Sequence, residues 1–234
     1  KSRTAYSRVR IEVAETPFFS RSVSEFVLNR PRTEYTIYPD IIWNYEALKN
    51  NVQAEPVSVA VKVEMNGDDL GQRVRTFSVR SINECLLGYV ANGTKFYDTS
   101  IFFAAYVNEE NPMIDQLLRE ALNTRIVNRF LGYQSKAKGV VDKQVYALWN
   151  ILQKRKFRYS SVSNTSLSSN VVFSQRVRTF DDALDSSQIN CVDGSVLFAS
   201  LLRAINIDPI LVRTPGHMFV GYYTDNSHTN KNFL

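Results

Sequence analysis

One cysteine and one histidine, Cys191 and His217, stand near the C-terminal end of the sequence at the ends of adjoining predicted elements. The chain has only two cysteines and two histidines. An ionised thiol is a nucleophile, and an imidazole can accept its proton and later donate it to a leaving group. Cys191 and His217 are therefore the candidate nucleophile and general base.

A helix is predicted from Val192 to Ile205, because its apolar residues recur every three or four positions. Asn190 has the side chain of an N-cap, and Asn206 suits a left-handed C-terminal position. Cys191 then falls in the first turn, where the helix dipole favours the thiolate over the thiol.

Two short strands are predicted after this helix. The first runs from Ile207 to Val212, Thr214-Pro215-Gly216 forms a turn, and His217 opens the second strand. If the strands are antiparallel, the second begins beside the start of the helix. We therefore expect the sulfur of Cys191 and the ring of His217 to lie close together.

The run C-V-D-G-S-V-L-F-A-S-L-L-R-A-I-N-I-D-P-I-L-V, followed by G-H-M-F-V-G-Y, resembles the core of the transglutaminase-like superfamily of papain-fold cysteine enzymes. The resemblance extends over about Arg176 to Tyr223 and does not cover the N-terminal half. It implies an α+β domain with Cys191 as nucleophile and His217 as base. Asp193 and Arg203 match the family helix, and we expect a first-turn dipole partner and a structural residue, respectively.

The resemblance also implies an acid, usually Asp, that orients the histidine from the following strand. An antiparallel partner of His217 should fall just past Leu234, so the sequence predicts an incomplete domain. Asp225 is a weaker candidate, because it falls in the turn far along the strand from His217. Acyl transfer also needs donors to the oxyanion, and the candidates are the Cys191 amide and, more weakly, the Gln188 side chain.

Two classes of function remain open. The first is a cysteine hydrolase of peptidase or amidase type, whose sibling reaction cross-links glutamine to lysine; its substrate is a peptide or protein. The second is a catalytically inactive domain that binds protein or carbohydrate. A third and weaker possibility is that the N-terminal half recruits a cell-surface polymer.

Residues 1–109 are predicted to form a small antiparallel β-sandwich, Ig-like in type, because apolar residues alternate along several short runs separated by turns. The runs are Arg8–Val13, Tyr35–Tyr45, Val57–Met65, Arg73–Val79 and Phe96–Val107. Asn66-Gly67 is predicted to join two of them as a hairpin. This half contains no catalytic constellation.

Residues 110–234 are predicted to form the transglutaminase-like domain. Asn111-Pro112 is a strong helix start, and helices are expected over 113–130, over 140–153 and after Thr179. The Ser- and Asn-rich segment 158–170 either rims the site or is a surface loop.

Composition limits the partners. The net charge is +5 with both signs interspersed, and no basic cluster of the kind that tracks nucleic acid is present. One Cys and one His do not make a zinc site, so neither a metal nor a cofactor is expected. No transmembrane segment is predicted. The chain opens at Lys1 without Met, and we expect a removed leader and an extracytoplasmic location, periplasmic or secreted.

Overall fold

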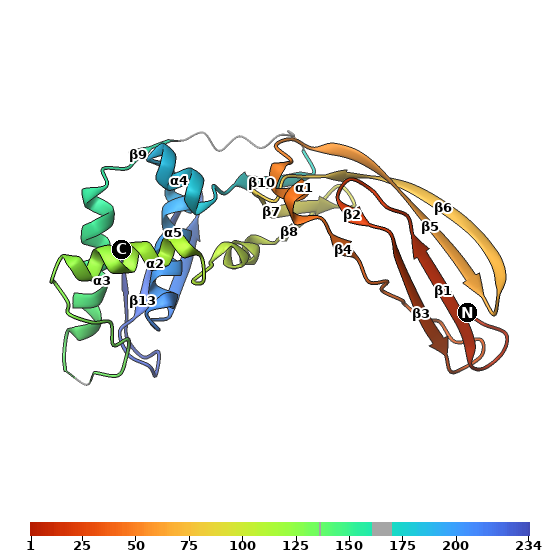
Figure 1. Ribbon diagram of the computed structural model, residues 1–234, viewed down its shortest axis with the longest axis horizontal. Helices are drawn as coiled ribbons and strands as arrows, with labels where there is room; N and C mark the ends of the chain where they lie inside the picture. Colours follow the sequence, from red (N-terminus) through yellow and green to blue (C-terminus); the bar gives the residue numbers. More distant parts are fainter. Residues whose placement is uncertain (136, 161–169) are drawn as a thin grey trace. The chain divides into compact units, whose positions relative to one another are not determined.

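The computed structural model describes residues 1–135, 137–160 and 170–234 (Figure 1). The chain divides into two compact units, Lys1–Ile82 and Asn83–Leu234. The division falls at Ile82 rather than at the boundary expected after residue 109. The reason is strand pairing, because β7 (Glu84–Ala91) pairs with β10 (Val172–Arg176), which comes much later in the chain.

The first unit is built on a four-stranded antiparallel sheet with the order β3-β1-β5-β6. These strands span Ser22–Leu28, Ser7–Val13, Glu55–Met65 and Asp68–Val79. As the Asn-Gly pair predicts, β5 and β6 form a hairpin, with φ of 52° at Asn66 and 92° at Gly67. A two-stranded sheet of β2 (Phe19–Ser20) and β4 (Ile42–Trp43) and the helix α1 (Tyr45–Asn50) complete the unit.

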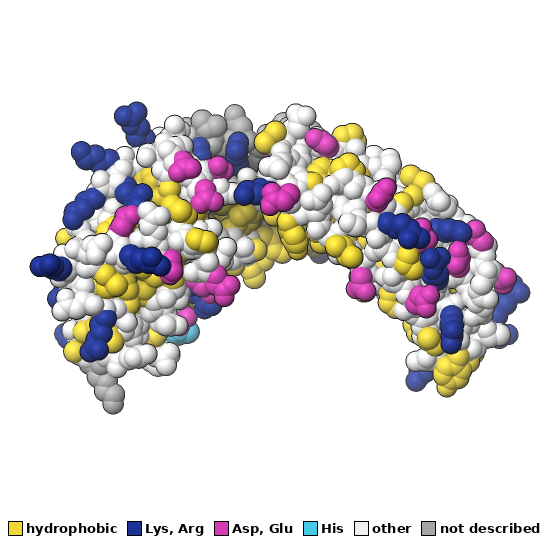
Figure 2. Space-filling view, viewed as in Figure 1, with side chains coloured by type: hydrophobic (Ala, Val, Ile, Leu, Met, Phe, Trp, Pro, Cys, Tyr) yellow, Lys and Arg dark blue, Asp and Glu magenta, His cyan; other side chains and the backbone are white. Residues whose placement is uncertain are grey.

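Alternation along β1 separates a core face from a charged face. Val9, Ile11 and Val13 are buried in the core of this unit. On the opposite face, Arg10 pairs with Glu64 at 3.3 Å, and further ion pairs join Glu12 to Arg21 and Lys62 to Glu64 and Asp69. Figure 2 shows the same mixture of basic and acidic side chains over the exposed surface of this unit. β6 lies at the edge of the sheet, and nearly all of its residues are exposed.

The run Tyr35–Tyr45, predicted as strand, is extended only at Ile42–Trp43. Its last residue begins α1 instead. The reason is a local cap, because the Asn44 side chain accepts a hydrogen bond from the Ala47 amide at 3.1 Å.

The second unit combines helices with small sheets, which confirms a mixed α+β fold with several antiparallel sheets. One sheet has the order β10-β7-β8, and another has the order β12-β13-β14. A short parallel pair joins β9 to β11. The elements are β8 (Lys95–Asp98), η1 (Ser100–Tyr106), α2 (Pro112–Asn123), α3 (Val140–Lys154), β9 (Arg158–Tyr159), α4 (Phe180–Ser186), β11 (Gln188–Ile189), α5 (Cys191–Ala204), β12 (Pro209–Thr214), β13 (His217–Tyr223) and β14 (Lys231–Phe233).

Helix α5 runs through the core of this unit, beside β13 (Figure 1). Ala199, Leu201 and Leu202 on α5 are inaccessible to solvent. Met218 and Val220 of β13 belong to the same buried cluster. The helix is therefore held on several sides by apolar contacts, which fixes the position of its first turn.

Three boundaries in this unit differ from the sequence predictions. Only the first three residues of the run Phe96–Val107 are strand, in β8, and most of the rest forms the 3₁₀ helix η1. Helix α2 ends at Asn123 and not at residue 130, because the Thr124 hydroxyl donates to the Ala121 carbonyl at 2.6 Å and Arg125 adopts a left-handed φ of 59°. Arg158 and Tyr159 form a strand, and residues 161–169 of the predicted loop lie outside the described residues.

Candidate functional site

Cys191 is the first residue of α5, as the sequence predicts. Asn190 caps the helix, and its side chain accepts from the amides of Val192 and Asp193 at 2.8 and 2.9 Å. In turn, the Asp193 side chain accepts a hydrogen bond from the Asn190 amide at 3.0 Å, which completes a capping box. None of these bonds uses the amide of Cys191, which therefore remains a candidate oxyanion donor.

A buried ion pair holds this helix start in place. The Asp193 side chain is 1% exposed and accepts from the Arg178 guanidinium at 2.6 Å and from the Arg178 amide at 2.9 Å. The same guanidinium donates to the Ser160 hydroxyl at 3.2 Å. Sequence reasoning gave Asp193 only a dipole role and missed Arg178, because a partner 15 positions away leaves no local signal.

His217 is the first residue of β13, also as predicted. The β12·β13 register pairs Thr214 with His217 across a two-residue turn, and Gly216 takes the φ of 76° that this turn requires. The His217 side chain is exposed, and its ring stacks on Phe219 with centroids 6.3 Å apart.

Cys191 and His217 line one pocket of about 430 Å³. The pocket lies among α3, α5 and β13. No hydrogen bond joins the two side chains in the part of the chain that the structure describes. Catalytic hydrogen bonds are often long in unliganded enzymes, so the shared pocket is the relevant observation.

Tyr159 is a residue of this site that sequence reasoning missed. It lines the same pocket, because the parallel β9·β11 pairing places it opposite Ile189, two residues before Cys191. Tyr159 is 68% exposed, and its pKa is raised, first by the negative charge of Cys191 and further by partial desolvation. The sequence does not reveal that Tyr159 lies near Cys191, because the two residues are more than 30 positions apart.

The structure does not bring Gln188 into the pocket. Gln188 lies on β11 with an exposed side chain, and it is not among the residues that line the cavity. Ile189 of β11 and its partner Tyr159 of β9 line the pocket instead.

Asp225 does not orient His217. It follows the far end of β13, and the seven residues of that strand span about 20 Å. Its carboxylate accepts hydrogen bonds from its own turn, from Ser227, Thr229 and Asn230. These bonds, the Ser227 side chain first, hold the pKa of Asp225 well below its ordinary value.

No carboxylate is hydrogen-bonded to His217 within residues 1–135, 137–160 and 170–234. In the β13·β14 pairing, Gly221 lies opposite Phe233, and the Leu234 amide donates to the Val220 carbonyl at 2.9 Å. The residues that β14 pairs with thus lie at the end of β13 away from His217.

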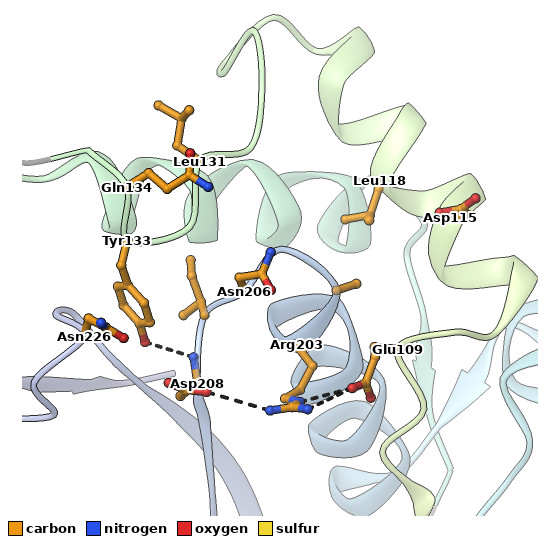
Figure 3. Close-up of a pocket in the computed structure, with 12 residues that line it drawn as sticks. Glu109, Asp115, Leu118, Leu131, Tyr133, Gln134, Arg203, Asn206, Asp208 and Asn226 are labelled. Carbon is orange, nitrogen blue, oxygen red and sulfur yellow. Dashed lines mark hydrogen bonds and ion pairs between the residues drawn. The ribbon is translucent and has the colours of Figure 1, made fainter.

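A larger, more polar pocket of about 870 Å³ lies near the other end of α5 (Figure 3). Arg203, expected to be structural, pairs there with Glu109 at 2.9 Å and with Asp208 at 3.8 Å. The Tyr133 hydroxyl accepts from the Asp208 amide at 2.9 Å. Its arginine is already paired, and its lining residues include neither Cys nor His, so this pocket offers no thiol nucleophile and no imidazole base.

The other histidine and cysteine are also accounted for. His228 is about half exposed, contacts Asp208 at 2.8 Å and stacks on Tyr223. Cys85 is buried, and neither cysteine forms a disulfide. Across the described residues, no group of three or more His, Cys, Asp or Glu side chains is placed to hold a metal ion.

Comparisons with known proteins leave the site to be judged on its geometry. No family model, no curated protein and no solved structure matches this chain. None of the described helices has the length and apolar character needed to cross a membrane.

Proposed function

We propose that the chain is a transglutaminase-like cysteine hydrolase that cleaves peptide or amide bonds. The observation that carries this proposal is the shared pocket, in which the first residue of a buried helix is a cysteine and the first residue of an adjoining strand is a histidine. The resemblance of residues 176–223 to the superfamily core supports the same reading.

The reaction would run through a thioester. His217 takes the proton from the Cys191 sulfur, the thiolate attacks the carbonyl carbon, and the developing oxyanion accepts from the Cys191 amide at the start of α5. His217 then gives its proton to the departing amine as the carbon–nitrogen bond breaks. Water, deprotonated by His217, attacks the thioester, which releases the acid and returns the proton to the sulfur. If an amine replaces water, the same intermediate gives cross-linking.

The wider proposal follows from the same resemblance. We take the second unit as a transglutaminase-like domain. We take the first unit as an Ig-like module that holds or recognises a partner such as a cell-surface polymer. An extracytoplasmic location, periplasmic or secreted, belongs to this proposal and does not depend on the chemistry.

A binding module without catalysis is the second candidate. The observation that favours it is the position of His217, which stacks on Phe219 and is bonded to no carboxylate in the described part of the chain. In that case the pocket would bind a peptide or carbohydrate group without attacking it.

Alkylation of Cys191 by iodoacetamide separates the two candidates. If the pair is catalytic, Cys191 should react at pH 6.5 about 10-fold or more faster in the native chain than in urea, because imidazolium and helix dipole favour the thiolate. His217→Ala should remove this difference, whereas His228→Ala, which changes the other histidine, should keep it. Equal rates in native and unfolded chains, unaffected by His217→Ala, would leave only the binding module.

A further inference from the structure

The pocket beside Cys191 has an apolar interior. Most of its apolar lining residues come from α3, the segment after it, α5 and β13, and they include Trp149, Phe157, Leu197, Phe198, Met218 and Phe219. Trp149 packs edge-on against Phe198 with ring centroids 6.0 Å apart. Trp149 is nevertheless 40% exposed, so a large aromatic face in this pocket meets solvent next to the candidate nucleophile.

The polar groups of the pocket are either already bonded or at its rim. The Ser195 hydroxyl donates to the Cys191 carbonyl at 2.7 Å, and the Asn190 side chain is occupied as the helix cap. Gln153 and Lys156 are exposed. Apart from Cys191, His217 and Tyr159 of the candidate site, the polar lining residues are bonded or exposed, and burying an unpaired charge among the apolar lining residues would be unfavourable.

The size of the cavity fits a side chain and not a whole domain. A pocket of about 430 Å³ lies in the range that holds a small organic group. Burying one aromatic or branched aliphatic side chain in such a pocket is worth about 10-fold or more in affinity.

We propose that this pocket binds a bulky apolar group of the acyl donor, so that the substrates of Cys191 are amides or peptides with an aromatic or branched aliphatic side chain next to the scissile carbonyl. The proposal rests on the proposed function for its chemistry, but the binding preference is a property of the pocket alone. The occupant is assigned to the acyl group because Cys191, His217 and Tyr159 line the same cavity.

Two primary amides of similar length, 3-phenylpropanamide and succinamate, test this directly. Trp43→Phe leaves Trp149 as the single tryptophan of the chain, and its fluorescence reports binding in the pocket. We expect 3-phenylpropanamide to bind at least about 10-fold more tightly than succinamate and to slow iodoacetamide alkylation of Cys191.

A matched pair of variants locates the effect. Phe157→Ala, which truncates a pocket wall, should weaken binding of 3-phenylpropanamide about fivefold or more. Tyr146→Ala should leave it unchanged, because Tyr146 is on the same helix as Trp149 but is 55% exposed and does not line the pocket. If Phe157→Ala perturbs folding, protection of Cys191 in the otherwise native chain still decides the question.

The outcomes separate this inference from the function. Equal affinity for the two amides, or binding of 3-phenylpropanamide without protection of Cys191, would overturn the pocket assignment. Preferential binding with protection, together with an alkylation rate that ignores His217→Ala, would keep the pocket and refute the enzyme. Equal affinity for the two amides, together with an alkylation rate of Cys191 that falls in His217→Ala, would keep the enzyme and refute its apolar preference.

Discussion

The two cysteines of the chain occupy contrasting environments. Cys85 is 1% exposed, and burial raises its pKa from an ordinary value of 9.0 to about 11. Cys191 is half-buried and lines a solvent-accessible pocket beside a histidine. Buried thiols react slowly, whereas accessible thiols at a helix start are often reactive, so the proposed function uses Cys191 and not Cys85 as its nucleophile.

The raised pKa of Cys85 makes the stability of the second unit depend on pH. Because the unfolded chain loses this proton near pH 9 and the folded chain only near pH 11, the contribution is complete below about pH 9 and is lost as the pH rises toward 11. Urea titrations from pH 8 to pH 10.5 should therefore show a falling free energy of unfolding.

Cys85→Ala should reduce the slope of the free energy of unfolding against pH. Cys191→Ala should leave that slope unchanged. Some slope should remain in Cys85→Ala, because burial also raises the pKa of Tyr106 and Tyr222. A slope identical in Cys85→Ala and the parent chain would contradict the assignment.

Tyr159 offers a spectroscopic test of the site that needs no substrate. Since the charge of Cys191 is the main cause of its raised pKa, Cys191→Ala should lower the pKa of Tyr159 toward the ordinary tyrosine value. Titration of tyrosine labelled with ¹³C at the ζ carbon, followed by NMR, measures this directly. Cys85→Ala is the control, and an unchanged Tyr159 titration in Cys191→Ala would show that the two side chains do not interact.

At the scale of elements, the start of α5 depends on the buried pair of Asp193 and Arg178. Asp193→Ala removes the carboxylate that pairs with a largely buried guanidinium and also removes the capping box, so it should lower the free energy of unfolding by about 3–5 kcal/mol. Asp181→Ala, at an exposed first-turn position of α4, should cost under about 1 kcal/mol. Urea denaturation measures both.

Removing both members of the pair is the informative comparison. The double variant Arg178→Met with Asp193→Leu should lose less stability than either single variant, because no unpaired charge remains. If Asp193→Ala costs no more than Asp181→Ala, the pair does not secure the helix start.

The features that the sequence predicted well are those with local causes. The Asn190 cap and Pro112 at the start of α2 are signalled by residues within one helical turn, and both helices begin where expected. The hairpin at Gly67 and the turn before His217 are equally local. The end of α2 was misplaced because Thr124 terminates it by a side-chain hydrogen bond that competes with continued apolar periodicity.

Features with long-range causes could not be predicted. The pairing of β7 with β10 moves residues 83–109 into the second unit, and Tyr159 reaches the site only through the β9·β11 pairing. Neither pairing has a spacing rule that a single sequence reveals. For the candidate site, Cys191 begins α5 and His217 begins β13 as the sequence predicts, whereas the neighbouring Tyr159 and Arg178 were not predicted.

At the scale of the whole molecule, the two units have separate cores that share no residue. Leu201→Ala, at a fully buried position of α5, should cost the second unit about 2–5 kcal/mol and leave the first unit unchanged. Ile11→Ala should do the reverse. Hydrogen exchange measured by mass spectrometry shows in which unit the amides lose protection. A loss of protection in both units from either substitution would contradict separate cores.

The exposed edge strand β6 has a consequence for self-association. A long strand with free amides and carbonyls is a template on which a second chain can extend a sheet and begin to aggregate. In the register with β5, Arg73 lies opposite Val61 and Arg75 opposite Val59, so two guanidinium groups sit on the side of the strand that carries the apolar core. A chain adding to this edge would have to bury its own apolar side chains against those charges, which disfavours strand addition at β6.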